Sequence, residues 1–277
     1  MPWRVWLPAS GQKPRAVLIT VHGLSGAASD FHLLGERLSS QGYAVYGYEL
    51  RGQGFDAQTS ARGDISAAKI WQRDLGQFHN LVKSRHPRVP VVWYGESLGS
   101  LIVLHTAAKR ERGAQPEAMV LATPIAGLRQ QLGEVEKFIL RATSHVVPRF
   151  KLTLGDLAGV DENNLRVTSQ TTHGEQMERT PHHVDSFSLR LLREVGDMMD
   201  GSIRAADKIH FPVLVLASPH DIVSSPEQIQ VLFRELDSRD KKLLWYSRSY
   251  HLLLHDVQRD QVVTDVSRWL ERTRKRR

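Results

Sequence analysis

Three residues that lie far apart in the sequence have the types needed for nucleophilic catalysis: Ser97, Asp221 and His251. A serine hydroxyl is a weak nucleophile at neutral pH, and it requires a neutral imidazole that accepts its proton as it attacks. The imidazole in turn requires a carboxylate, which fixes its tautomer and stabilises the imidazolium that forms. Each of the three comes just after a stretch with the composition of a buried strand. The sequence therefore predicts a catalytic triad whose members are positioned by the ends of strands.

The segment around Ser97 has the pattern of a strand, a sharp turn and a helix. Mostly β-branched and aromatic residues over 91–94 lead into Gly-Glu-Ser-Leu-Gly at 95–99, and an apolar stretch typical of a helix follows over 101–108. A serine on so tight a turn adopts a strained backbone, and the flanking glycines let strand and helix close beneath it because they lack a Cβ. We therefore predict that Ser97 is the nucleophile. The alternative is a serine that merely fills the turn.

Backbone N–H groups near the nucleophile are candidates for an oxyanion hole. An apolar run over 16–21, typical of a buried strand, ends in a glycine-rich turn, His22-Gly23-Leu24-Ser25-Gly26. We predict that the N–H groups of Leu24 and Leu98 form the oxyanion hole, where losing one donor typically costs about 3–4 kcal/mol of transition-state stabilisation. His22 is either a catalytic base or, as we favour, a residue that braces the loop.

Two of the triad assignments have competitors nearby. His255 competes with His251, but His251 lies closer to the end of its strand, where a loop can reach over the sheet. Glu49 competes with Asp221 because it also ends a strand, although it precedes the nucleophile in the sequence. Glu96, beside the serine, is interpreted as an exposed residue or a brace for the turn rather than as the triad acid. Asp221 and His251 are the favoured pair.

The elements that must position these residues alternate along the chain. Apolar runs of the length of buried strands are separated by segments with helical periodicity, such as 65–85 and a closing helix near the C-terminus. The predicted strands lie at 16–21, 43–50, 91–94, 117–124, 211–217 and 242–246. This alternation predicts an α/β fold with a mostly parallel sheet and helices on both faces.

The alternation stops between residues 125 and 208. Apolar residues from Leu128 to Ala142, Leu132 among them, repeat at helical spacing, and 186–199 predicts a second helix. A polar loop without strand character lies between them at 161–181. We predict that this segment is an inserted helical cap over the carboxyl edge of the sheet. The chain then divides into an α/β core at 1–124, the cap at 125–208 and the second part of the core at 209–277.

The composition is that of a globular protein and excludes several kinds of chemistry. Of 277 residues, 41% are hydrophobic and 24% charged, which is ordinary for a globular domain, and no apolar run reaches the length of a membrane span. The chain has no cysteine, which excludes thiolate metal sites and a cysteine nucleophile. His173, His182 and His183 lack acidic partners at ligand spacing, so neither a metal nor another cofactor is expected.

The formal charge of +7 is partly local, since residues 272–277 are Arg-Thr-Arg-Lys-Arg-Arg. The favoured interpretation is a solvated helix end, where the helix dipole stabilises cations. The alternative is attraction to an anionic membrane or lipid aggregate. No nucleic-acid-binding motif is present, and the N-terminus lacks the apolar core of a signal peptide. We expect a cytoplasmic protein, with peripheral contact to a membrane surface as an alternative.

Five short motifs together resemble those of the monoacylglycerol lipase and lysophospholipase group of serine α/β-hydrolases. They are His22-Gly23-Leu24, Arg51-Gly52-Gln53-Gly54, Gly95-Glu96-Ser97-Leu98-Gly99, Ser218-Pro219-His220-Asp221 and Tyr250-His251. The chain order of serine, acid and histidine is also that of α/β-hydrolases. The chain departs from the family at Gln53, where a histidine is usual, and at Glu49, where an aspartate is usual. Its N-terminus also looks short of the family's leading hairpin strands.

The resemblance implies an α/β-hydrolase fold in which the three candidate residues form the triad, the two backbone N–H groups the oxyanion hole, and the insertion a lipid-admitting cap. We expect a cofactor-independent serine carboxylesterase or lipase that cleaves acyl esters, with monoacylglycerols or similar single-chain lipids as substrates. An acyltransferase or aminopeptidase on the same scaffold is the enzyme alternative. A peptidase would need acidic cap residues to bind the substrate amine, and the candidates are Glu134, Glu136, Asp161, Glu162 and Glu175. A non-catalytic lipid-binding homologue is the alternative from another class.

Overall fold

The structure, a computed structural model, describes residues 1–277 apart from 57, 112, 130–132, 154, 157–160 and 276–277. Its main sheet has seven strands in the order β1-β3-β2-β4-β5-β8-β9, with β1 antiparallel to β3 and every other pair parallel. The strands are β1 (Trp3–Trp6), β2 (Val17–Val21), β3 (Ala44–Tyr48), β4 (Val91–Glu96), β5 (Ala118–Ala122), β8 (Val213–Ala217) and β9 (Lys241–Trp245). The predicted α/β fold with a mostly parallel sheet is confirmed.

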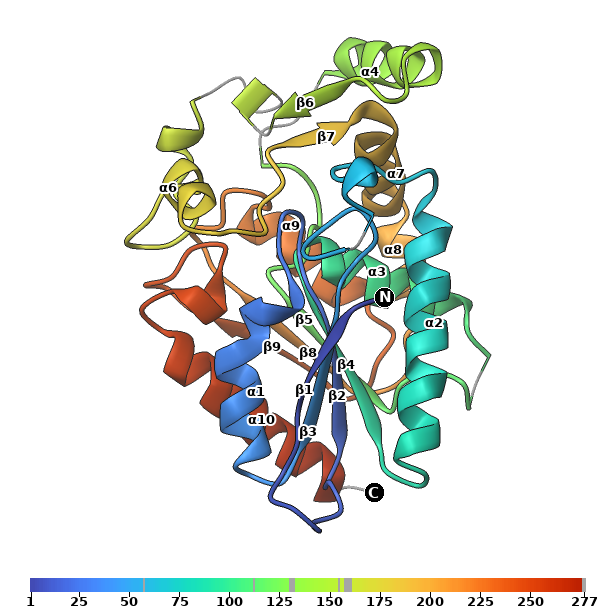
Figure 1. Ribbon diagram of the computed structural model, residues 1–277, viewed down its shortest axis with the longest axis vertical. Coiled ribbons are helices and arrows are strands. Elements are labelled where there is room, and N and C mark those ends of the chain that lie inside the picture. Colours follow the sequence, from blue (N-terminus) through green and yellow to red (C-terminus); the bar gives the residue numbers. More distant parts are fainter. Residues whose placement is uncertain (57, 112, 130–132, 154, 157–160, 276–277) are drawn as a thin grey trace.

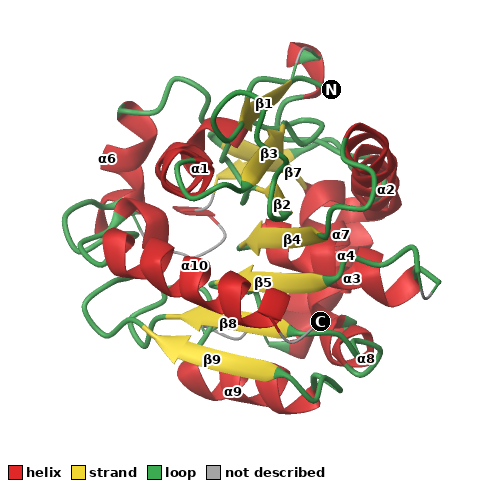
Figure 2. Ribbon diagram, turned by 90° about the horizontal axis from the view of Figure 1, so that it is seen from below, coloured by secondary structure: helices red, strands yellow, loops and turns green. Residues whose placement is uncertain are grey.

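The central strands are buried because helices cover both faces of the sheet (Figure 2). α1 (His32–Ser39) and α10 (Arg259–Lys275) lie on one face, and the other face carries α2 (Ala68–Arg85), α3 (Leu98–Lys109), α8 (Ser202–Ala206) and α9 (Pro226–Glu235). Short 3-10 helices occur at η1 (Ala28–Phe31), η2 (Thr59–Ala61) and η4 (Leu253–His255). Strands without a solvent-facing side are nearly continuous apolar runs, which is why their sequence patterns predict them.

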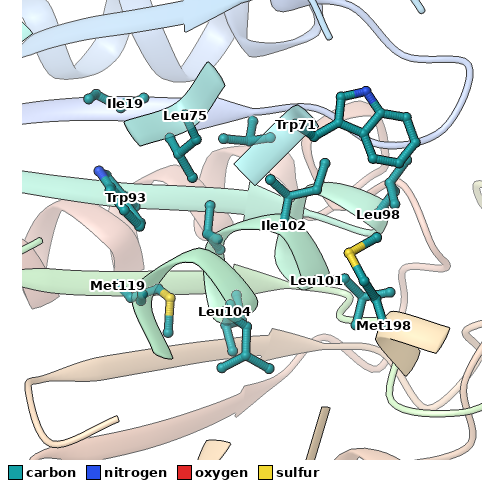
Figure 3. Packing of buried hydrophobic residues seen from close by; sticks show 14 of the residues in the cluster. Ile19, Trp71, Leu75, Trp93, Leu98, Leu101, Ile102, Leu104, Met119 and Met198 are labelled. Atoms are coloured by element: carbon teal, nitrogen blue, oxygen red, sulfur yellow. The ribbon is translucent and has the colours of Figure 1, made fainter. Parts of the chain in front are cut away.

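The core between the sheet and α3 adjoins the turn that carries Ser97, and Figure 3 shows how its buried residues pack. Leu101, Ile102 and Leu104 of α3 share one buried cluster with Trp93 of β4 and Met119 of β5, and none of the five is more than 1% exposed. α3 is almost entirely apolar because α2 and α8 also pack against it. Fully burying one such side chain stabilises a fold by about 1.5–3 kcal/mol, so the start of α3 is firmly anchored.

The sequence patterns do not predict β1, whose residues are mostly exposed at the edge of the sheet. Its tryptophans attach it to the core. The ring of Trp3 stacks 5.6 Å from that of Tyr46, and the indole of Trp6 lies so close to Gly35 of α1 that a Cβ there would come within 2.2 Å of it. The chain therefore has one leading strand that pairs with β3, although the apolar pattern of this strand is too short to be recognised.

Most of the segment 125–208 that the structure describes lies beyond the carboxyl ends of the strands, at the top of the molecule in Figure 1, whereas its last part, at α8, lies lower and beside α3. Before α8 it contains α4 (Glu134–Val146), β6 (Lys151–Thr153), η3 (Glu162–Asn164), α6 (His173–Glu178), β7 (Ser186–Ser188) and α7 (Leu189–Asp200). The first predicted helix is present but starts at Glu134 rather than Leu128, and Leu132 lies outside the described residues. α7 and α8 pack against α3, so the end of this segment is joined to the core.

Two predictions within this segment are wrong in detail. Residues 186–188 form β7, paired antiparallel with β6, and α7 begins only at Leu189 because Ser188 Oγ accepts the Leu191 N–H as an N-cap. The predicted polar loop contains α6, which starts at a capping box formed by Thr172 and Glu175. Such short elements depend on caps and on partners distant in sequence, which periodicity does not reveal.

Candidate active site

The turn between β4 and α3 presents Ser97 on a strained backbone. Ser97 has φ 53° and ψ −117°, a left-handed conformation that costs free energy for a residue with a Cβ. A Cβ on Gly99 would come 2.0 Å from the Val21 carbonyl oxygen, and one on Gly95 would come 2.4 Å from the Gly99 carbonyl oxygen. Only glycine fits at either position, so the Gly-x-Ser-x-Gly pattern has a steric cause in this chain.

The side chains of the three predicted triad residues meet at this turn. His251 Nε2 lies 2.9 Å from Ser97 Oγ, and His251 Nδ1 lies 2.9 and 3.0 Å from the two carboxylate oxygens of Asp221. They come from the β4–α3 turn, the loop after β9 and the loop after β8 respectively. All three residues are at least nine-tenths buried. With Nδ1–H donated to the carboxylate, Nε2 is the nitrogen free to accept the serine proton.

The environment of His251 favours its protonated form. Burial disfavours the imidazolium, but the charge and hydrogen bond of Asp221, and then the charge of Glu96, outweigh burial and raise the pKa of His251 above its ordinary value. The Asp221 carboxylate is itself held by the Val223 N–H, at 2.7 Å. This arrangement stabilises an imidazolium that forms when a proton leaves Ser97.

The competing residues lie at other places in the structure. His255 lies in η4, and the histidine hydrogen-bonded to Ser97 Oγ is His251. The Glu49 carboxylate accepts the N–H groups of Ala28 and Phe55, at 3.2–3.3 Å. Within the described part of the chain, the carboxylate hydrogen-bonded to His251 is that of Asp221.

His22 and Gln53 brace the loop that follows β2. The Leu50 N–H donates to His22 Nε2 at 3.1 Å, so Nδ1 carries the proton and donates to the Gly23 carbonyl at 2.8 Å. Burial lowers the pKa of His22, in keeping with this neutral tautomer. Gln53 Oε1 accepts the Ser25 N–H at 2.9 Å. The interpretation of His22 as a bracing residue is confirmed, and Gln53 braces the same loop through its hydrogen bond to Ser25.

The two predicted oxyanion donors belong to segments that adjoin Ser97. Leu98 is the first residue of α3, and the first N–H groups of a helix have no partner within it. Leu24 follows Gly23, whose backbone passes so close to Ser97 that a Cβ on it would lie 3.2 Å from Ser97 Cβ and 3.7 Å from Ser97 Oγ. The helix dipole at the start of α3 also favours negative charge there.

Glu96 is not exposed, so that alternative is wrong. Its side chain is 3% exposed, and Oε1 has no hydrogen-bond partner among the described residues. Burial, and next the charge of Asp30, raise the pKa of Glu96 to about 7. Alternation along β4 could have revealed this, because Val92, Tyr94 and Glu96 share one face of a strand whose two faces are both covered.

The histidines of the segment 125–208 have partners that do not form a metal site. His182 Nε2 lies 3.2 Å from Asp30 Oδ1, and His183 Nδ1 lies 2.7 Å from the Thr180 carbonyl. Over the described ranges, no group of three or more His, Cys, Asp or Glu is placed to hold a metal ion.

The basic C-terminal helix end is partly neutralised within the molecule. Arg272 pairs with Asp240 at 2.9 Å and Arg274 with Glu271 at 2.8 Å, while 276–277 lie outside the described residues. None of the helices in the described parts of the chain has both the length and the apolar character needed to cross a membrane.

Comparison with known proteins supports one family. A sequence model described as "Serine aminopeptidase, S33" matches residues 12–258. The chain is 23% identical over 270 residues to a monoglyceride lipase of Rattus norvegicus (96% of this chain, 85% of that protein). It is 22% identical over 258 residues to a carboxylesterase of Bacillus subtilis (93% of each). The crystal structure of a Paleococcus ferrophilus monoacylglycerol lipase superposes with a TM-score of 0.82 at 22% identity, over 98% of each chain.

These matches confirm the fold and the family resemblance that the motifs indicated. The family match covers the strands of the main sheet from β2 to β9 and the segment between β5 and β8. The protein therefore belongs to the serine aminopeptidase S33 family of α/β-hydrolases.

Proposed function

We propose that the protein is a serine carboxylesterase that cleaves acyl esters of single-chain lipids, with monoacylglycerols as the substrate class. The observation that carries the proposal is the hydrogen-bond chain from Ser97 through His251 to Asp221 on a strained turn. Relatives named monoglyceride lipase and carboxylesterase support ester chemistry. The monoglyceride lipase and the structural similarity to a monoacylglycerol lipase support the lipid substrate.

In the proposed reaction, Ser97 Oγ attacks the ester carbonyl while His251 Nε2 takes its proton. Asp221 keeps Nδ1 protonated and stabilises the imidazolium. The negative charge on the carbonyl oxygen is stabilised by the N–H groups of Leu24 and Leu98. The tetrahedral intermediate then collapses to an acyl-enzyme as His251 gives its proton to the leaving alcohol. A water activated by His251 attacks the acyl-enzyme, releasing the fatty acid and restoring Ser97.

We assign residues 125–208 the role of a cap inserted between core segments 1–124 and 209–277. Two hydrogen bonds support this role: the Val184 N–H donates to Ser25 Oγ at 2.7 Å, beside the proposed oxyanion loop, and the Leu252 N–H donates to the Val167 carbonyl at 3.0 Å, beside His251. A segment attached at both sides of the site would control how a substrate reaches it. Because Ser97 and His251 are less than 10% exposed, a lipid substrate would require this segment to shift.

The exposed apolar side chains of the segment support contact with lipid. Ile139, Val146, Val147 and Phe150 are 43–81% exposed and lie at or after α4. Arg149 and Lys151 flank Phe150 with positive charge. We propose that this surface touches lipid aggregates or a membrane transiently, which would give a cytoplasmic enzyme access to its substrate.

An aminopeptidase is the second candidate because the family itself is described as serine aminopeptidase. Such an enzyme would need acidic residues for the substrate amine. Glu175 is already engaged in the capping box of α6, and Asp161 accepts the Asn163 N–H. The side chains of Glu134, Glu136 and Glu162 lie outside the described parts of the structure. The acidic residues that the structure describes therefore give little support to a peptidase. Among the described residues, no specific contact favours an acyltransferase or a non-catalytic binding protein either.

Hydrolysis of p-nitrophenyl esters from acetate to palmitate, measured beside a monoacylglycerol and an amino-acid anilide, tests the proposal. We expect the rate to peak at medium or long chains, with release of glycerol from the monoacylglycerol. Ser97→Ala should abolish turnover and labelling by a fluorophosphonate, whereas Ser84→Ala, on an exposed helix end, should change neither. Retained hydrolysis by Ser97→Ala, or cleavage of the anilide alone, would overturn the proposal.

A further inference from the structure

Residues 177–184, here termed the strap, lead from the end of α6 to β7 (Figure 1) and lie against Ser25 in the loop after β2. The Val184 N–H donates to Ser25 Oγ at 2.7 Å, and Ser25 Oγ donates in turn to the Val184 carbonyl at 3.2 Å. The same oxygen lies 3.5 Å from Met177 Sδ. Because Val184 is buried, the loss of the hydroxyl would cost its backbone both hydrogen bonds at a place that water reaches poorly.

The strap is held by the core at a second place, beside Arg62. The Arg62 guanidinium donates to the His182 carbonyl at 2.7 Å and to the His183 carbonyl at 3.0 Å. The side chain of His182 is buried as well, with its Nε2 at 3.2 Å from Asp30 Oδ1. These contacts fix residues 182 and 183 by themselves. The strap therefore meets the loop after β2 as a segment that is already held in place.

Ser25 lies in a tight turn, in a backbone conformation that favours glycine. The Gly26 N–H donates to the Gly23 carbonyl at 3.2 Å, so Leu24 and Ser25 are the two central residues of the turn. Ser25 has φ 60°, in the left-handed region, which costs free energy for a residue with a Cβ. Its N–H donates to Gln53 Oε1 at 2.9 Å. Contacts from two other segments, one on the N–H and one on the hydroxyl, therefore keep Ser25 in this conformation.

The same turn carries a predicted donor of the oxyanion hole, the Leu24 N–H. Leu24 directly precedes Ser25, and the backbone of Gly23 is so close to Ser97 that a Cβ on it would lie 3.2 Å from Ser97 Cβ. A rotation of the turn about Ser25 would therefore move the Leu24 N–H relative to Ser97. A misplacement of about 1 Å in a catalytic group can lower a rate about 100-fold. The conformation of Ser25 thus matters for catalysis without any contact between its side chain and a substrate.

We propose that Ser25 is a positioning residue for the oxyanion hole and that it acts only while the strap is docked on it. The inference rests on the proposed function, because it works through the Leu24 N–H and the attack of Ser97. The hydrogen bonds with Val184 hold the turn in the conformation that presents the Leu24 N–H to the carbonyl oxygen of the ester. A strap that shifts to admit a lipid breaks these bonds. The oxyanion hole is then complete only after the strap has closed again over the bound ester.

Ser25→Gly removes the hydroxyl but suits a positive φ, so the turn itself can still form. For hydrolysis of p-nitrophenyl butyrate we expect kcat to fall roughly 10- to 100-fold while KM changes by less than about 2-fold, because the loss arises in the transition state. The inhibition constant of an alkyl trifluoromethyl ketone, whose adduct with Ser97 carries an oxyanion, should rise by the same factor. Ser39→Ala is the matched control: it removes a hydroxyl that bonds the Glu36 carbonyl at the exposed end of α1, and it should change neither quantity.

Arg62→Met tests whether the strap acts through Ser25. The substitution removes the donors to the His182 and His183 carbonyls, so the strap should dock less often and kcat should fall roughly 3- to 10-fold. In the Ser25→Gly background the same substitution should leave kcat unchanged, because the strap has then already lost its hold on the turn. Effects of the two substitutions that simply multiply would show that Arg62 and Ser25 act independently, and would overturn the inference.

The outcomes separate this inference from the proposed function. An unchanged kcat in Ser25→Gly would overturn the inference alone. So would a rise in kcat/KM, because the strap would then be a barrier to the substrate and nothing more. A parent protein that neither hydrolyses the ester nor reacts with a fluorophosphonate would overturn the proposed function and this inference with it. If Ser25→Gly does not fold, Arg62→Met decides the question, since an unchanged kcat in that variant also contradicts the coupling.

Discussion

At the scale of single residues, the reactive turn depends on positions where no side chain fits. Ser97 keeps its left-handed backbone because β2, β4 and α3 approach one another closely at Gly95 and Gly99. Strain of this kind persists only where the surrounding packing determines it, and here the buried cluster around α3 does so. The sequence pattern could indicate the need for glycine, but only the structure identifies the carbonyl of Val21 as the group that forbids a Cβ.

Gly99→Ala should therefore destabilise the protein by about 2–4 kcal/mol, since its Cβ would overlap the Val21 carbonyl oxygen, 2.0 Å away. Ester hydrolysis should fall with it, because any relief moves Ser97. Gly196→Ala is the matched control: it lies within α7, meets nothing within 4 Å, and should stabilise the protein by about 0.5–1 kcal/mol through helix propensity. Urea unfolding of both variants measures the difference. Equal stabilities would contradict the steric argument.

Glu96 also makes a prediction about stability that does not depend on catalysis. Its pKa is raised from 4.5 to about 7 in the folded protein, so the folded state holds the proton more tightly than the unfolded state. This contribution is fully present below pH 4.5 and is lost as the pH rises through about 7. Glu96→Gln should therefore gain about 2–4 kcal/mol relative to the parent protein between those limits.

Unfolding free energies of both proteins at about pH 4.5 and pH 8 test this, because the titrating groups that do not interact with Glu96 are common to the two and cancel in the difference. A difference between them that is the same at both pH values would show that Glu96 keeps an ordinary pKa.

At the scale of elements, the sequence patterns predict the strands that are buried on both faces of the sheet. They do not predict an element that depends on partners distant in the sequence. β2, β4, β5 and β8 are apolar enough to be predicted from their own residues. β1, β7 and α6 are not. β1 is stabilised by tryptophans that pack across strands, β7 by a three-residue pairing with β6, and α6 by a capping box. The site residues fall in the predictable class, since each follows one of the recognisable strands.

Asp256 joins the loop that carries the proposed catalytic histidine to a segment of the proposed cap. Its carboxylate, 4% exposed, accepts the Tyr250 N–H at 2.8 Å, the Val257 N–H at 2.7 Å, and both the N–H and the hydroxyl of Ser169. It thereby ties residue 169 of the proposed cap to the loop that carries His251. Every partner is a donor, so an amide group in its place would set an NH₂ against N–H groups.

Asp256→Asn should cost about 1–3 kcal/mol of stability and lower kcat/KM roughly tenfold or more, because the His251 loop loses part of its anchoring. Asp260→Asn makes the same chemical change on α10, where the side chain is 70% exposed and pairs only at the surface with Arg37. It should alter stability by less than about 0.5 kcal/mol and leave activity unchanged. Thermal unfolding and ester hydrolysis of the two variants provide the comparison, and equal effects would refute the anchoring role.

At the scale of the whole molecule, buried apolar surface is distributed unevenly. The sheet has a large buried cluster on each face, formed with the helices that cover it. Between residues 126 and 183, by contrast, Val167 is the one buried hydrophobic residue in the described part of the chain. α7 and α8, which end the segment 125–208, pack on α3 instead. Periodicity does not indicate this packing, because a helix has the same apolar spacing whether it packs on a cap or on a core.

Hydrogen exchange should reveal the same division as a difference in opening free energy. Amides between 126 and 183 should exchange at least about 100-fold faster than those of β2, β4 and β5, because little apolar surface must be exposed to open that segment. A fluorophosphonate adduct on Ser97 should slow exchange in 126–183 if the segment covers the site, and should leave the outer face of α2 unchanged as an internal control. Exchange in 126–183 as slow as in β4 would mean that the segment unfolds only with the core, and a cap that must move to admit a lipid would then be untenable.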